Sequence, residues 1–157
     1  AFIDEIMNTF DKRRTVLVIS PISGNEELRR MNGKYFTNDA FYKCIKYIIS
    51  NGIQLILYYT LNIVGETKEQ LQDTSVQMSL LHHIFKLNKR NVFYQRVFID
   101  PLAGRRNLDG IEVEYNTFMD YYNYCQSEKP GYELTGFVDN SEVSSEDKLK
   151  MYEKIFD

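Results

Sequence analysis

The sequence lacks most of the features that would assign a function directly. It contains no tryptophan and only two cysteines, Cys44 and Cys125, which lie far apart in the chain. Two distant cysteines match neither a disulfide framework nor a metal-ligand spacing, and we interpret them as thiols of a reduced, cytoplasmic protein. His82 and His83 are neighbours, and neighbouring residues of a helix point in different directions. We therefore expect no metal site within this chain.

Three further absences limit the expected partners. The net charge of −3 at pH 7 provides no basic face for nucleic acid. No apolar run approaches the roughly 20 residues that a membrane-spanning helix needs, and no signal peptide precedes the helical pattern that starts at Phe2. Neither G-x-G-x-x-G nor a Walker A motif is present, so a phosphate cradle is not supported. We expect no nucleic acid and no membrane among the partners.

What is present is an alternation of buried strands and amphipathic helices in a chain of 157 residues. Continuous apolar runs predict parallel strands that are covered on both faces. The predicted strands are 15–20, 53–63 and 91–99, and the predicted helices are 2–12, 37–51, 67–85, 115–126 and 145–156. This order predicts an α/β fold of parallel βαβ units, either an open sheet or part of a barrel.

Local signals mark several element ends. Thr37 is a predicted N-cap, Gly52 a predicted helix stop in the left-handed conformation, and Thr67 with Gln70 a predicted capping box. We predict that residues 102–114 are irregular and that the aromatic helix 115–126 fills the core. For the last helix we predict one apolar face. Its members are Leu149, Tyr152 and Ile155.

The loops after the strands are the places to look for a site, because parallel α/β folds bind ligands at the carboxyl ends of their strands. After the first strand, Gly24 would let the backbone approach a ligand, while Ser23 and Asn25 add short polar groups. After the second strand, Gly65 would make a tight turn. Glu66 is open to two interpretations, an ordinary acid at a helix start or a site residue.

Several short motifs occur in a recognisable order along the chain. They are Ser23-Gly24, Glu27-Leu28, Arg30-Met31-Asn32, Asn51-Gly52-Ile53 and Gly65-Glu66-Thr67. Together they resemble the C-terminal half of a radical S-adenosylmethionine (SAM) enzyme, of the subgroup that often carries a cobalamin-binding domain. The resemblance covers about residues 15–110, including the segment around Asp100-Pro101.

The chain also departs from that family. Ile22 stands where the family usually has Glu, Asn62 where it has Gly, and Val64 where it has Pro. No C-x-x-x-C-x-x-C motif is present, and two cysteines cannot supply the three thiolates that hold the family's [4Fe-4S] cluster. The resemblance therefore implies a single fragment, residues 1–157, whose missing N-terminal half would be a partner and would carry the cluster.

The resemblance further implies half of a (β/α)6 partial TIM-type barrel over residues 1–110, followed by a C-terminal helical extension over 111–157. It implies SAM as cofactor of the parent protein, with cobalamin as a further candidate. This chain alone would hold no cofactor, contribute no catalytic residue and be inactive. The implied cofactor-binding residues are Ser23, Gly24 and Asn25 at the methionyl or ribose side, Asn62, Ile63, Gly65 and the adjoining Glu66 near the adenine, and Asp100 and Pro101 below it.

Two alternatives stay open at this point. Ile22, Asn62 and Val64 are compatible with a degenerate, non-catalytic α/β module, in which the aromatic residues of 115–124 would form an interaction surface. An unrelated doubly wound sheet would bind a small ligand at a switch point and would show a strand order incompatible with a barrel arc. The half-barrel interpretation predicts an exposed strand edge and, through it, a homodimer.

Overall fold

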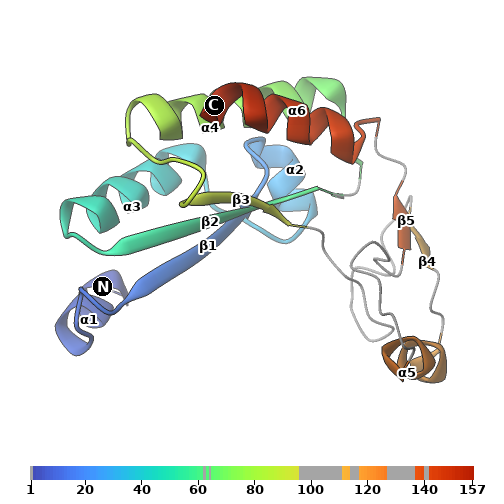
Figure 1. Cartoon of the computed structure of the whole chain (residues 1–157), viewed down its shortest axis with the longest axis horizontal. Coiled ribbons are helices and arrows are strands. Elements are labelled where there is room, and N and C mark those ends of the chain that lie inside the picture. The colour runs from blue at the N-terminus through green and yellow to red at the C-terminus, as the bar shows by residue number, and fades with distance from the viewer. Residues whose placement is uncertain are drawn as a thin grey trace.

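The computed structural model of the chain describes residues 2–61, 63, 65–95, 111–113, 117–126, 137–139 and 142–157. Helices and strands alternate over most of this length (Figure 1). In chain order they are α1 Phe2–Thr9, β1 Val16–Ile22, α2 Glu26–Met31, α3 Asn38–Ser50, β2 Gln54–Thr60, α4 Lys68–His83, β3 Val92–Gln95, β4 Ile111–Val113, α5 Phe118–Gln126, β5 Phe137–Asp139 and α6 Ser145–Phe156.

The centre of the fold is a parallel sheet of three strands in the order β1-β2-β3. Val18 of β1 pairs with Ile56 of β2, and Leu57 of β2 pairs with Val92 of β3. The predicted α/β fold with parallel strands is confirmed. The strand bounds differ from the predictions: β1 continues to Ile22, and β2 is shorter at both ends than the predicted 53–63 because a turn precedes it and a bend follows it.

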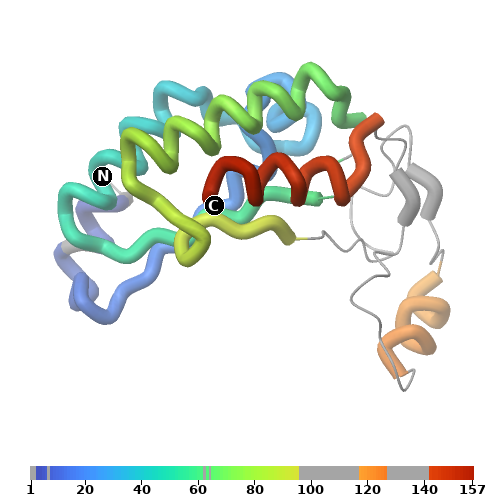
Figure 2. Tube along the Cα trace, turned by 45° about the horizontal axis from the view of Figure 1, so that its top comes forward, coloured from blue at the N-terminus to red at the C-terminus, as the bar shows by residue number. Residues whose placement is uncertain are grey.

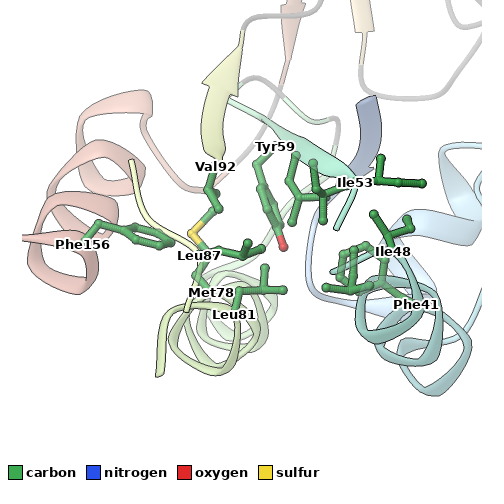
Figure 3. Packing of buried hydrophobic residues seen from close by; sticks show 12 residues of the cluster. Phe41, Ile48, Ile53, Tyr59, Met78, Leu81, Leu87, Val92 and Phe156 are labelled. Carbon is green, nitrogen blue, oxygen red and sulfur yellow. The ribbon is translucent and has the colours of Figure 1, made fainter. Parts of the chain in front are cut away.

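Helices α3 and α4, which carry the chain between successive strands, cover the same face of the sheet (Figure 3). The side chain of Tyr59 points from β2 into the space between these two helices. It packs with Ile48 of α3 and with Met78 and Leu81 of α4, all four with no exposed surface. Each such apolar side chain contributes about 1.5–3 kcal/mol when it is fully buried. Phe156 brings α6 into the same core.

The opposite face of the sheet is apolar but exposed. Alternate residues of a strand point to opposite faces, and on this face Val18 is 56% exposed, Val16 43% and Phe93 36%. The rings of Tyr58 and Phe93 contact each other across β2 and β3, with centroids 5.8 Å apart. The helices of the described chain therefore bury one face of the sheet and leave the other open.

The predicted caps are confirmed. The Thr37 hydroxyl accepts from the Ala40 N–H at 3.2 Å, and Gly52 has a φ of 72° just after α3. Thr67 and Gln70 form both hydrogen bonds of a capping box at the start of α4. These signals are local in sequence, which is why they can be read without knowing the fold.

Two predictions about the C-terminal region are wrong, and a third is correct only in part. Part of the segment predicted as irregular forms β4, which pairs antiparallel with β5; strands of three residues are too short to show a period. Helix α5 does not fill the core: Phe118 is 60% exposed and Tyr122 47%, and their rings stack on each other. In α6, Tyr152 and Ile155 pack against the core as predicted, but Leu149 is 41% exposed and Lys148 is buried instead.

Helix α6 runs beside α4, as both tube and ribbon views show (Figure 2). It is fixed to the sheet as well, since the Tyr152 hydroxyl donates to the Val92 carbonyl at 2.6 Å. Among the described residues, no helix combines the length and the apolar character that crossing a bilayer requires.

Candidate functional site

The loop that follows β1 is held against α4. The Ser23 hydroxyl hydrogen-bonds the Thr74 hydroxyl at 3.0 Å, and the Gly24 N–H donates to the same Thr74 oxygen at 2.9 Å. Ser23 and Thr74 are both buried. The polar groups that follow this strand are therefore engaged with a helix of the same chain.

Gly24 is needed for a contact within the chain. A Cβ at this position would lie 2.5 Å from the Thr74 Cα and 2.6 Å from the Asp73 carbonyl oxygen, both backbone atoms of α4. Gly24 was predicted to let the backbone approach a ligand, and in the structure the group that it approaches is a helix of the same chain.

Asn25 has two tasks in the structure. Its side-chain oxygen accepts from the Leu28 N–H at 2.8 Å and caps α2, and its amide nitrogen donates to the Asp73 carboxylate at 2.7 Å. These bonds tie α2 to α4. Together with Ser23 and Gly24, Asn25 fixes the position of the first strand-end loop.

Ile22 stands at the end of β1 in a strained conformation. Its φ of 64° lies in the left-handed region, which β-branched residues rarely adopt. The Ser23 N–H donates to the Pro21 carbonyl at 2.8 Å, which closes a three-residue turn centred on Ile22. Its side chain is buried with Leu28 and Ile63. Position 22 is therefore buried and strained, which no local sequence signal indicates.

A buried arginine that the sequence did not single out connects this loop to α3. Arg29 has no exposed surface; its guanidinium donates to the Ser23 carbonyl at 2.8 Å and to the Asn38 side-chain oxygen at 2.7 Å, and stacks over Phe36 at 4.8 Å. Burial lowers the pKa of Arg29, and the nearby charge of Glu26 opposes that shift. The group nevertheless stays charged, since arginine does not deprotonate in proteins.

The hydrogen-bonded chain continues from Asn38 into the core. Gln77 of α4 donates to the Asn38 side-chain oxygen at 2.8 Å and accepts from the Tyr59 hydroxyl at 2.6 Å. Gln77 and Tyr59 are both buried. A polar network therefore runs from the end of β1 through α3 and α4 to β2. Its members lie too far apart in sequence for any spacing motif to reveal them.

The connection from β2 to α4 holds the second group of predicted residues. Ile63 has no exposed surface, and Gly65 has a φ of 72°, which confirms the predicted tight turn. Glu66 precedes the N-cap Thr67, so it lies just outside the helix. Its carboxylate is buried and forms an ion pair with Lys148 of α6, whose ammonium also donates to the Leu61 carbonyl at 2.6 Å.

Tyr94 of β3 lies close enough to Glu66 for the two to interact electrostatically. Burial raises the pKa of the Tyr94 hydroxyl, and the negative charge of Glu66 raises it further. The hydroxyl oxygen is buried and has no hydrogen-bond partner in the described part of the chain. The region thus contains a carboxylate, an ammonium and a phenol that are all shielded from water.

A depression of about 430 Å³ opens beside the first loop, on the helix-covered side of the sheet. Gly24 and Asn25 line it, together with residues of α2, α3 and α4. No group of three or more His, Cys, Asp or Glu residues in the described ranges could hold a metal ion. Asn62, Asp100 and Pro101 are outside the described residues, so their predicted places at the site stay predictions.

Comparison with known proteins adds no relative. No protein-family model, curated protein or solved structure gives a significant match to the chain.

Proposed function

We propose that this chain is the C-terminal half of a radical SAM iron–sulfur oxidoreductase domain, and that it positions SAM and substrate in half of a (β/α)6 partial barrel. One observation carries the proposal: the parallel strands follow in sequential order, and the long helices between them, α3 and α4, cover the same face of the sheet. In a barrel all helices lie outside and the other face turns inward. The exposed face with Val18 and Phe93 would then face the barrel interior.

The strand order also bears on the alternatives. A doubly wound sheet binds its ligand where the strand order reverses, and the order β1-β2-β3 contains no reversal within the described strands. The strand order therefore does not favour the doubly wound sheet. A degenerate, non-catalytic module remains the second candidate, and Ile22 favours it, because a buried apolar residue replaces the family's acid there.

The parent domain would hold a [4Fe-4S] cluster, which supplies the electron for the reductive cleavage of SAM. This chain does not fit the cluster, since Cys44 and Cys125 are its only cysteines. Its contribution would be positional. The side chains of Ser23 and Asn25 already form hydrogen bonds with Thr74, Asp73 and the start of α2. These two residues would therefore act by fixing the position of the loop.

At the second strand end, the residues would act mainly through their backbone. Ile63 and Gly65 would offer their backbone groups there, and Gly65 reaches its left-handed conformation because it has no Cβ. With that geometry the connection could line the adenine side of SAM. The chain would exclude water and orient the cofactor, and it would transfer no electron or proton itself.

The test is to express the complete reading frame, reconstitute it with iron and sulfide without oxygen, and add a reductant and SAM. The proposal predicts 5′-deoxyadenosine, measured by liquid chromatography. A protein with a full cluster that releases none would refute the proposal. A reading frame without a three-cysteine motif upstream would favour the non-catalytic module.

A matched pair of glycines ties the activity to this chain. Gly65 and Gly52 share a φ of 72°, and a Cβ at either would meet nothing within 4 Å. Their substitution by alanine should therefore strain the backbone equally, by about 1–2 kcal/mol. Gly65→Ala should reduce 5′-deoxyadenosine formation much more than Gly52→Ala, because only Gly65 lies in the proposed cofactor connection. Equal effects would count against that assignment.

A further inference from the structure

One side chain holds both ends of the connection between β2 and α4. The Lys148 ammonium donates to the carbonyl of Leu61, directly after β2, and pairs with the carboxylate of Glu66, directly before the α4 N-cap. The Lys148 side chain is 1% exposed and that of Glu66 is 3% exposed. A third contact also holds Glu66, since the Glu142 N–H donates to the Glu66 carbonyl at 3.1 Å.

Burial makes this ion pair different from the other pairs of α6. Lys150 and Glu146 form a pair along the helix, with side chains 67% and 75% exposed. Exposed pairs of that kind are screened by water and contribute little. A buried pair is intolerant of losing one member, because the remaining charge has no solvent to stabilise it. Lys148 and Glu66 must therefore stay together in the folded chain.

The helix that supplies Lys148 is itself anchored. Tyr152 donates to the Val92 carbonyl of β3, Phe156 lies in the main core, and Asp157 pairs with Lys89. Helix α6 also packs along α4 (Figure 2). Because α6 is anchored, Lys148 holds Leu61 and Glu66 at a fixed position relative to this helix. A shift of either residue would break a contact of the buried ammonium.

We propose that Lys148 is a positioning residue for SAM. Through Glu66 and the Leu61 carbonyl it fixes the connection that contains Ile63 and Gly65, so the C-terminal helix α6 is a working part of the cofactor site. This inference rests on the proposed function, in which that connection lies at the adenine. Lys148 touches no cofactor itself and acts through the backbone that it holds.

The test uses Lys148→Met in the complete protein, which removes the ammonium and keeps most of the apolar stem. We expect the KM for SAM to rise roughly ten- to a hundredfold, which corresponds to about 1.4–2.8 kcal/mol of lost binding, with a smaller change in kcat. Lys150→Met, two residues away and exposed, is the matched control and should leave both constants unchanged. Lys148→Arg keeps the charge and should recover part of the loss.

A second measurement does not depend on activity. Hydrogen–deuterium exchange of the Ile63, Gly65 and Glu66 amides should speed up in Lys148→Met and stay unchanged in Lys150→Met. If Lys148→Met does not fold, the neutral double variant Glu66→Gln with Lys148→Met takes its place, since it leaves no buried charge unpaired.

The outcomes separate the two proposals. A wild-type protein that forms no 5′-deoxyadenosine overturns the proposed function, and this inference with it. An active wild type whose KM for SAM and amide exchange are both unchanged by Lys148→Met overturns this inference alone. A raised KM together with faster exchange supports it.

Discussion

At Gly24 the backbone of a strand-end loop lies directly against the backbone of α4. An added Cβ would be 2.5 Å from the Thr74 Cα, so one of the two backbones would have to shift. We predict that Gly24→Ala lowers the free energy of unfolding by about 2–3 kcal/mol, the upper part of the usual cost of overpacking a core. Gly52→Ala should cost less, about 1–2 kcal/mol, because its Cβ meets open space and only φ is strained.

Urea denaturation of the two variants measures this difference. If the two variants lose the same stability, the loop and α4 are not in close contact, and the anchoring of Ser23 and Asn25 would need a different account.

Two tyrosines with buried hydroxyl groups, Tyr59 and Tyr94, allow a comparison at a single atom. The Tyr59 hydroxyl donates to Gln77 at 2.6 Å, whereas the buried Tyr94 hydroxyl has no partner within the described residues. Tyr59→Phe should destabilise the fold by about 1–3 kcal/mol, since it leaves the Gln77 oxygen without its donor. Tyr94→Phe should be neutral or slightly stabilising. Thermal unfolding of both variants gives the answer, and a Tyr94→Phe loss as large as that of Tyr59→Phe would reveal a missing partner.

Sequence reasoning at the residue scale succeeded where the cause is local. Thr37, Gly52 and Thr67 were predicted correctly, because caps and left-handed turns depend on residues within one helical turn. The strain at Ile22 and the burial of Arg29 were not predicted. Both depend on groups that only the folded chain brings together.

Among the elements, α6 is the one whose contact with the β2–α4 connection could not be predicted from the sequence. Its buried face contains Lys148, which reads as a solvent-exposed residue until its partner Glu66 is known. Helices α3 and α4 and strands β1 and β2 were predicted because their apolar patterns are long. The three-residue strands β4 and β5 were missed, and the aromatic α5 was wrongly assigned to the core because composition does not show which neighbours a helix has.

The ion pair between Lys148 and Glu66 leads to a prediction for stability as well as for function. Lys148→Met should lower the free energy of unfolding by about 3–5 kcal/mol, because it leaves the Glu66 carboxylate buried and unpaired. Adding Glu66→Leu should restore much of that loss, since the double variant contains no buried charge. Lys150→Met should change stability by less than about 1 kcal/mol.

A double-mutant cycle from denaturant titrations measures the coupling between the two side chains. Additive effects of Glu66→Leu and Lys148→Met would show that the pair does not hold α6 to the β2–α4 connection, and the positioning proposal would lose its basis.

On the scale of the whole molecule, only one face of the sheet is covered by helices of the described chain. Helices α3, α4 and α6 bury one face, while Val16, Val18 and Phe93 on the other are exposed. Strand β1 is at the edge of the sheet, with no strand beyond it in the described chain. Apolar faces and unpaired edges both favour association with another chain. The half-barrel proposal explains this asymmetry, because a complete barrel would turn the same face inward.

Without its proposed other half, the chain should therefore associate with itself, most simply as a symmetric dimer. Val18→Lys places a charge on the open face beside the edge, where Val18 is 56% exposed, and should shift the protein to monomer. Val76→Lys is the matched control, since Val76 is 51% exposed on the outer side of α4 and should leave association unchanged. Sedimentation velocity across the micromolar range compares the three proteins. A wild type that stays monomeric throughout would contradict the prediction, and equal effects of the two lysines would place the contact elsewhere than on the open sheet face.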